Sequence, residues 1–173
     1  MRNREHLDAV IKAYDVRGVV GKDIDEDFVR DTAAAYAAIL RSEGESTLAI
    51  GHDMRPSSPA LAQAFAEGAT SQGIDVILLG LTSTDELYYA SGDLGCAGAM
   101  FTASHNPARY NGIKLCRAGA RPVGQETGLS EIKDMLVNGV PEYSGKPGTI
   151  SEKNVLDGYA AFLNSLVDLS DIR

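Results

Sequence analysis

The sequence has little of several features that define large classes of proteins. Its 173 residues include only two cysteines, Cys96 and Cys116, and each lies within an apolar run. Two separated thiols with no histidine nearby do not form a zinc-binding pattern, so we expect both to be buried and reduced. Reduced thiols are typical of a cytoplasmic protein, and the cytoplasm is the location that we expect.

Long apolar stretches and an excess of positive charge are also missing. Residues 1–8 alternate charges without an apolar segment, so we expect no signal peptide. The longest compact apolar run, Val76–Leu79, is far too short to span a membrane. The net charge of −8 argues against a nucleic-acid-binding surface, although a local group of arginines and lysines can still bind an anion. We therefore expect no nucleic acid and no membrane as a partner.

Apolar runs alternate with amphipathic stretches along the chain. The apolar runs predict strands at residues 10–13, 47–50, 75–79, 96–101 and 113–117. Helices are predicted at 25–42, from 58 onward, and at 83–90, 126–137 and 154–167. Nearly continuous apolar strands that alternate with helices are typical of a sheet with helices on both faces. The sequence therefore predicts an α/β fold, a three-layer α/β/α sandwich around a largely parallel, mixed sheet.

Several residues mark where the helices begin and where the domain ends. Asp25 and Ser58 are predicted N-caps, and Ser83 opens a capping box with Glu86. Residues 138–151 are rich in glycine and proline and show little periodicity, which indicates a connector. We predict a domain over residues 1–150 and a connector helix within 151–173 that leads toward a second domain.

The most informative stretch is a polar, turn-rich loop between two apolar runs, with Ser104 at its tip. A phosphoserine carries roughly −1.5 to −2 charge and three strong acceptor oxygens, so it needs donors and cations nearby. His105, Asn106, Arg109 and Lys114 can supply them. This grouping suits a serine that carries a phosphoryl group.

The residues alone leave alternatives open. Ser104 can be an ordinary serine of a surface turn, and Ser104 beside His105 also suggests a serine hydrolase. Adjacent loop residues seldom meet in the geometry of a nucleophile and its base, and the sequence has no Gly-x-Ser-x-Gly elbow. His105 can bind phosphate or move a proton, or it can hydrogen-bond the backbone. Lys114 can neutralise a phosphate as a point charge, or it can be a solvated lysine at a strand end.

Two further polar segments, 14–18 and 51–57, are expected to follow strands. Ligands in such sheets bind beyond the carboxyl ends of the strands, so these segments and the Ser104 loop are expected to converge. Arg17 can bind two phosphate oxygens through its planar guanidinium, or it can form an ion pair within its turn. Asp53 and Arg55 are expected to brace their loop. His52 is expected to be incidental and Arg109 a surface charge.

The run Thr-Ala-Ser-His-Asn-Pro at 102–107 resembles the phosphoserine loop of the α-D-phosphohexomutases, the family of phosphoglucomutase and phosphomannomutase. The continuation Asn-Gly-Ile-Lys at 111–114, the segment Tyr-Asp-Val-Arg-Gly at 14–18 and the Gly-x-Asp-x-Arg pattern at 51–55 resemble the same family, in the same order. The resemblance implies a phosphoglucomutase domain I fold. It also implies site residues, which are Ser104, His105, Lys114 and Arg17 for catalysis and Tyr14 and Asn106 for substrate or phosphate binding.

The resemblance implies a phosphate shift between C1 and C6 of a hexose, which is mannose, glucose or both. Phosphorylated Ser104 would donate to the free hydroxyl, and the hexose 1,6-bisphosphate would reorient and return its other phosphate. A hexose 1,6-bisphosphate would also serve as activator. Mg²⁺ would be held by the phosphate on Ser104 and by aspartates of a second domain, which this sequence does not contain.

The resemblance covers only the first of the family's four domains. We therefore expect an N-terminal domain of a longer enzyme, with a phosphosugar and the remaining domains of the same polypeptide as partners. Such a domain alone is expected to have little or no mutase activity, and its helix at 154–167 is expected to expose an apolar face. The alternative is a stand-alone, non-catalytic phosphate-binding or regulatory domain.

Overall fold

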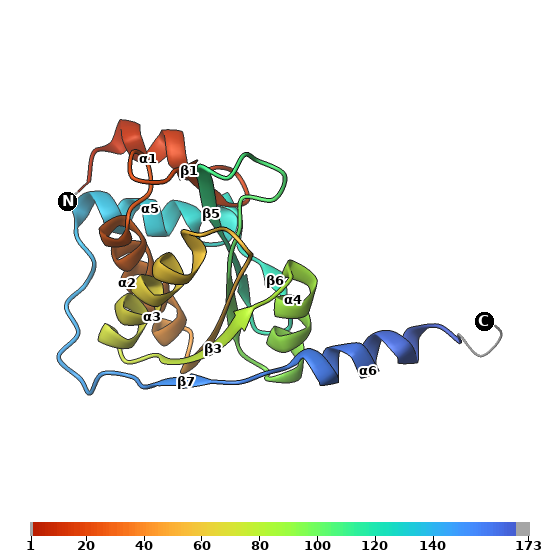
Figure 1. The fold of residues 1–173 in the computed structure, drawn as a ribbon. Coiled ribbons are helices and arrows are strands. Elements are labelled where there is room, and N and C mark those ends of the chain that lie inside the picture. Colours follow the sequence, from red (N-terminus) through yellow and green to blue (C-terminus); the bar gives the residue numbers. More distant parts are fainter. Residues whose placement is uncertain (1, 169–173) are drawn as a thin grey trace.

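A seven-stranded sheet runs through the centre of the molecule, for which the computed structural model describes residues 2–168 (Figure 1). The strands are β1 (Val16–Val19), β2 (Thr47–His52), β3 (Asp75–Leu81), β4 (Ala97–Phe101), β5 (Tyr110–Arg117), β6 (Arg121–Pro122) and β7 (Ile150–Glu152). Their order is β1-β5-β4-β2-β3-β7, and β6 pairs with β5. Strands β4, β2, β3 and β7 run parallel to one another, whereas β5 is antiparallel to β1, β4 and β6. The predicted largely parallel, mixed sheet is confirmed.

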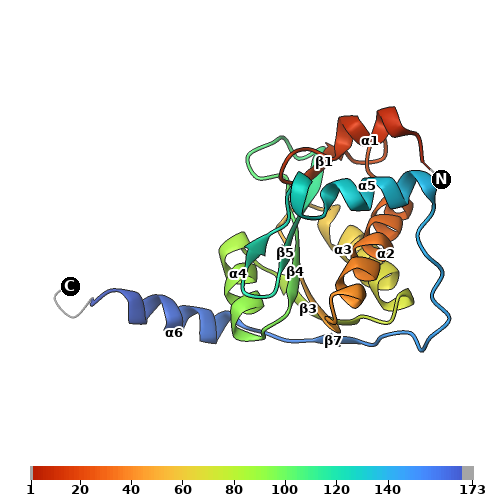
Figure 2. The ribbon, with the colours of Figure 1, turned by 180° about the vertical axis from the view of Figure 1, so that it is seen from behind.

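Helices cover both faces of this sheet. They are α1 (Arg4–Val10), α2 (Glu26–Ser42), α3 (Ser58–Ser71), α4 (Thr84–Asp93), α5 (Leu129–Asn138) and α6 (Leu156–Leu166), with a 3₁₀ helix η1 (Gln125–Thr127). Helices α1, α2, α3 and α5 lie on one face and α4 lies on the other, as Figure 2 shows from behind. The predicted three-layer α/β/α sandwich is therefore also confirmed.

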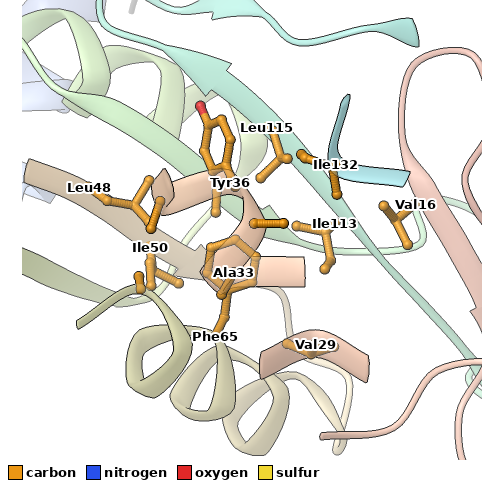
Figure 3. Close-up of a cluster of buried hydrophobic side chains, with 14 of the residues drawn as sticks. Val16, Val29, Ala33, Tyr36, Leu48, Ile50, Phe65, Ile113, Leu115 and Ile132 are labelled. Atoms are coloured by element: carbon orange, nitrogen blue, oxygen red, sulfur yellow. The ribbon is translucent and has the colours of Figure 1, made fainter. Parts of the chain in front are cut away.

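The main core lies between the sheet and the α2–α3 layer. Tyr36 of α2 and Phe65 of α3 are fully buried there against Ile50 and Ile113 of the sheet (Figure 3). The hydroxyl of Tyr36 donates to the carbonyl oxygen of Cys116 at 2.9 Å, so the ring is buried without an unpaired polar atom. A second, smaller cluster under α4 contains Leu87 and Met100 together with Ala49 and Cys96.

Two of the three predicted N-cap residues do cap their helices. The Asp25 carboxylate accepts from the backbone N–H of Phe28 at 2.7 Å and caps α2. The Ser83 hydroxyl accepts from the N–H of Glu86 at 3.1 Å and caps α4. The cap predicted at Ser58 is wrong, because Ser58 is the first helical residue and its hydroxyl donates to Asp53 instead.

The N-terminal segment differs from the prediction. The strand expected at 10–13 is absent, because Val10 ends a helix and Ile11 forms only an isolated bridge with Val16. Asn3 caps this helix, and its Leu7 and Val10 are three residues apart and both buried. A helix of seven residues, about two turns, offers few apolar positions from which to recognise its period. The first strand is Val16–Val19 instead.

The C-terminal part differs in smaller ways. The helix predicted at 126–137 is interrupted at Gly128, whose φ of 144° separates η1 from α5. Strand β7 begins at Ile150, pairs with β3 and so extends the sheet past the predicted domain boundary at residue 150. The division of the chain into two domains at that position stays a prediction.

Helix α6 lies within the helix predicted at 154–167 and projects away from the sheet (Figures 1 and 2). It meets the rest of the molecule where Tyr159 and Phe162 pack on the ring of Tyr89. The predicted exposed apolar face is present, since Leu163 and Leu166 are largely solvent-accessible. Residues 169–173 of the predicted connector lie outside the described residues. No helix within residues 2–168 is both long enough and apolar enough to cross a membrane.

Two helical glycines test how closely the α2–α3 layer is packed. A Cβ atom at Gly68 would lie 2.2 Å from the carbonyl oxygen of Arg30, so we expect Gly68→Ala to lower the free energy of unfolding by roughly 1–3 kcal/mol. Gly92 of α4 has nothing within 4 Å of that position, so Gly92→Ala should raise it by roughly 0.5–1 kcal/mol. Urea denaturation of both variants measures these changes, and equal effects would contradict the close α2–α3 contact.

Candidate functional site

Ser104 lies in the loop that follows the carboxyl end of β4, and ligands bind at this end of the strands in such sheets. Its φ is 54°, in the left-handed region that costs a non-glycine residue of order 1 kcal/mol or more. The hydroxyl of Thr102 accepts from the N–H of Ser104 at 3.0 Å and supports this turn. The side chain of Ser104 is exposed and available to react.

The guanidinium of Arg55 holds the serine loop in place. Its Nη2 donates to the carbonyl oxygens of Ser104 and Asn106, both at 2.8 Å. Its Nη1 donates to the carbonyl oxygens of Pro107 at 2.8 Å and Tyr110 at 3.1 Å. Arg55 therefore braces not only its own loop, as expected, but also the loop that carries Ser104.

Asp53 in turn orients Arg55. Its carboxylate accepts from the Nε of Arg55 at 3.0 Å, from the backbone N–H of Arg55 at 3.0 Å and from the hydroxyl of Ser58 at 2.7 Å. Burial alone would raise the pKa of Asp53, but the hydrogen bonds from Ser58 and Arg55 and the charge of Arg55 outweigh it and lower that pKa. Asp53 therefore remains ionised and paired with the buried Arg55.

Asn111 ties the far end of the loop to the start of α3, a role that sequence reasoning missed. Its side-chain amide is fully buried and donates to the hydroxyls of Ser57 and Ser58 at 2.9 Å each. Gly112 follows because a Cβ atom there would lie 2.3 Å from the carbonyl oxygen of Val16. The Asn-Gly pair, which the sequence analysis placed in a family motif, thus joins β5 to α3 and lets β1 approach β5.

Two cations gather beside the serine loop around one carboxylate. Arg17 Nη2 lies 2.5 Å from Asp15 Oδ2, and Lys114 Nζ lies 3.8 Å from the same oxygen. Arg17 is opposite Gly112 in the sheet and Lys114 is opposite Met100, so both side chains lie on the α4 face. The Nε of Arg17 is buried and has no hydrogen-bond partner among the described residues. The cluster therefore has more cationic than anionic groups and retains donors for a further anion.

The segment 14–18 reaches the site by a route other than the one predicted. It does not follow a strand, because Arg17 lies within β1 itself. Strand β1 pairs with β5, and β5 pairs with β4, so Arg17 and Lys114 still lie close to the strand that ends at the serine loop. The segment 51–57 does follow β2, as predicted.

The other predicted site residues differ in their positions. His105 Nδ1 lies 3.3 Å from Ser104 Oγ, and both side chains are exposed. The amide of Asn106 donates to the carbonyl oxygen of Ala103 at 2.9 Å and stabilises the loop itself. Tyr14 is 79% exposed and lines a hollow with Gln125, and it has no contact with Ser104 in the described part of the chain.

Arg109 and His52 were not predicted to act in catalysis or binding. Arg109 is exposed, with its guanidinium 5.2 Å from the ring centroid of Tyr110, which fits the predicted surface charge. Nδ1 of His52 lies 3.0 Å from the carbonyl oxygen of Asp53. Neither side chain contacts Ser104 among the described residues.

We expect Arg55→Lys to lower the free energy of unfolding by roughly 2–4 kcal/mol, because an ammonium group cannot serve four carbonyl oxygens and a carboxylate at once. Hydrogen exchange should show faster opening of the backbone at residues 103–110. Arg109→Ala is the matched control in the same loop and should change stability by less than about 0.5 kcal/mol. Unchanged exchange in the Arg55 variant would show that other contacts hold the loop.

The lowered pKa of Asp53 gives a pH dependence with a definite sign. The contribution of ionised Asp53 to the stability of the folded state is complete above the pKa of the unfolded carboxyl, about 3.9. This contribution is lost as the pH falls through the lower pKa of the folded state. The stability difference between wild type and Asp53→Asn should therefore be constant near neutral pH and shrink below about pH 4. Urea denaturation of both proteins across this range measures it, and a difference that shrank on going to higher pH would contradict the assignment.

Comparison with known proteins agrees with this geometry. The family model described as "Phosphoglucomutase/phosphomannomutase, alpha/beta/alpha domain I" matches residues 8–139. A phosphomannomutase of Vibrio cholerae is 44% identical over 125 residues, which are 70% of this chain and 27% of that protein. The protein named "Phosphohexose mutases" of Xanthomonas campestris is 41% identical over 165 residues, which are 94% of this chain and 36% of that protein.

The solved structures agree with the sequence relatives. A crystal structure of a phosphoglucomutase/phosphomannomutase family protein from Burkholderia thailandensis superposes with a TM-score of 0.83 at 28% identity, over 95% of this chain and 36% of that one. The chain thus spans about a third of the length of the relatives it matches. Taken with the serine loop, its brace and its cations, these matches show that the chain belongs to the phosphoglucomutase/phosphomannomutase family and contains its α/β/α domain I.

Proposed function

We propose that this chain is the phosphoserine-carrying domain of a phosphohexomutase that interconverts hexose 1-phosphate and hexose 6-phosphate, with mannose, glucose or both as the sugar. The observation that carries the proposal is the position of Ser104. Its hydroxyl is presented in a strained turn at the end of β4, fixed by Arg55 and close to the strands that hold Arg17 and Lys114.

Each half of the reaction is a phosphoryl transfer at Ser104. A sugar hydroxyl attacks the phosphorus of phosphorylated Ser104, its O–P bond forms, and the bond from phosphorus to Ser104 Oγ breaks. The hydroxyl gives up its proton and Ser104 Oγ gains one, and His105 Nδ1, 3.3 Å from that oxygen, is placed to hold the proton. The hexose 1,6-bisphosphate then presents its other phosphate, and the reverse transfer regenerates phosphorylated Ser104.

Charge neutralisation is the main demand of such a transfer. Arg17 offers a planar donor group with one nitrogen that has no partner, and Lys114 adds a second positive charge. Asn106 would stabilise the turn of the serine loop through its hydrogen bond to Ala103. The exposed Tyr14 would contact the edge of a bound substrate.

The family resemblance also implies Mg²⁺, and the donor set of this domain fits only part of a site for it. No group of three or more His, Cys, Asp or Glu side chains that could hold a metal is found among residues 2–168. The phosphate on Ser104 would be the ligand from this domain, and carboxylates elsewhere in the polypeptide would supply the others. When bound, the ion would neutralise negative charge on the transferring phosphoryl group.

The partners of this domain follow from the same proposal. They are a phosphosugar and the remaining domains of a longer polypeptide, so we expect the 173-residue chain alone to have little or no mutase activity. Two free, buried thiols, Cys96 and Cys116, support a cytoplasmic location.

The proposal predicts which atom accepts a phosphate. After incubation of the full-length protein with glucose 1,6-bisphosphate, intact mass and peptide mapping should find one phosphate within residues 102–114. The Ser104→Ala variant should lack it and should lose at least about 10³-fold in turnover, because the covalent step is gone. Ser165→Ala, which removes an exposed hydroxyl on α6, is the control and should be phosphorylated like wild type.

The same measurement on the 173-residue chain separates the two functions considered from sequence. Phosphate on full-length protein but not on the shorter chain would show that the metal and other domains are needed to load Ser104. Absence of phosphate on both would contradict the mutase proposal and favour a non-catalytic phosphate-binding domain.

A further inference from the structure

Asp15 is the acidic residue that the two cations beside the serine loop share. One of its carboxylate oxygens, Oδ2, lies 2.5 Å from Arg17 Nη2 and 3.8 Å from Lys114 Nζ. The side chain of Asp15 is only 13% exposed, compared with 28% for Arg17 and 29% for Lys114. Solvent and salt screen partly buried charges much less than exposed ones, so the charge of Asp15 acts strongly on both cations.

The register of the sheet places Arg17 nearer to the serine loop than Asp15. Arg17 is opposite Gly112 of β5, and the carbonyl oxygen of Gly112 accepts from the N–H of Thr102 at 3.1 Å. Arg17 therefore shares a row of the sheet with the residue that opens the serine loop. Asp15 comes two residues earlier on the neighbouring antiparallel chain, which sets it level with Lys114 in the next row. The carboxylate thus draws Arg17 away from the loop.

Both cations keep donors that Asp15 does not use. The Nε of Arg17 is buried without a hydrogen-bond partner in the part of the chain that the structure describes. The 3.8 Å between Lys114 and Asp15 is an ion-pair distance, too long for a hydrogen bond. A phosphoryl group on Ser104 would bring three acceptor oxygens and roughly −1.5 to −2 charge to the same donors. The carboxylate and the phosphoryl group would therefore compete for one pair of cations.

We propose that Asp15 is a positioning residue for phosphoryl transfer, which holds Arg17 and Lys114 together and competes with the phosphoryl group on Ser104 for them. The inference rests on the proposed function, because it takes Ser104 to carry that group. Cations that bind the phosphorylated ground state more tightly than the transition state slow the transfer. As the bond to Ser104 Oγ breaks in a loose transition state, negative charge leaves the phosphoryl oxygens. By weakening the hold of both cations on those oxygens, Asp15 speeds the transfer.

The test uses the full-length enzyme after its Ser104 has been phosphorylated by glucose 1,6-bisphosphate. Asp15→Asn keeps the shape of the side chain and removes its charge, and we expect single-turnover transfer to mannose 1-phosphate to slow roughly 3- to 30-fold. Phosphorus NMR should show a lower pKa for the phosphate on Ser104, because a nearby negative charge is gone. Asp15→Ser, which is also neutral, should change both quantities in the same direction. Asp15→Glu keeps the charge and should transfer within about threefold of the wild-type rate.

Asp31→Asn is the matched control, since it removes the carboxylate from another arginine–aspartate pair, formed by Asp31 of α2 with Arg2. It should leave the transfer rate within about twofold and the pKa of the phosphate unchanged. Unchanged or faster transfer in Asp15→Asn, an unchanged or raised pKa of the phosphate, an equal loss in Asp15→Glu, or failure of both neutral variants to fold would each overturn the inference. Failure of the wild-type enzyme to take up phosphate at Ser104 would instead reject the proposed function, so the two failures are distinguishable.

Discussion

The contact of the Arg55 guanidinium with four carbonyl oxygens of the 104–110 segment is the interaction on which the site depends. The carbonyl oxygens of such a loop lack the regular backbone hydrogen bonds of a β-sheet. One planar guanidinium with five N–H donors supplies hydrogen bonds to them instead. The cost of burying its charge is offset by Asp53, whose own oxygens are held by Ser58 and by the backbone of Arg55. Ser58 at the start of α3 therefore fixes Asp53, Asp53 orients Arg55, and Arg55 holds the loop that carries Ser104.

This brace explains how Ser104 keeps a left-handed backbone. A serine at φ 54° would relax in a free loop, but its carbonyl oxygen is bound to Arg55 and its N–H to Thr102. Asn111 holds the other end of the loop to the start of α3 through two serine hydroxyls. With both ends and the middle fixed, the backbone of Ser104 is held in place while its side chain is exposed. Such preorganisation suits the proposed phosphoryl transfer, because transfer depends on position.

The sequence predicted the layers of the fold well because the strands β2, β3 and β4 are continuously apolar and because Asp25 and Ser83 mark helix starts by their own chemistry. The prediction was wrong at residues 10–13, because a helix of seven residues that buries only Leu7 and Val10 has too few apolar positions to be told from a strand. The sequence predicted that Asp53 and Arg55 brace their own loop, but not that Arg55 also holds the serine loop, since no local pattern shows contacts to residues 49 to 55 positions further along the chain. The functional roles of Ser104, Arg17 and Lys114 stay predictions. The sequence placed Asn111 in a family motif but did not show that its amide is fully buried and joins β5 to the start of α3, because burial and distant partners exist only in the folded chain.

The charges around Ser104 are divided between the two sides of β4. On the β5 side, Arg17 and Lys114 share the single carboxylate of Asp15, which reduces their mutual repulsion while leaving the Nε of Arg17 without a partner. On the β2 side, the carboxylate of Asp53 is paired with Arg55, and that of Glu86 has no ion pair with any residue among 2–168. A phosphoryl group on Ser104 is attracted toward the first side and repelled from the second.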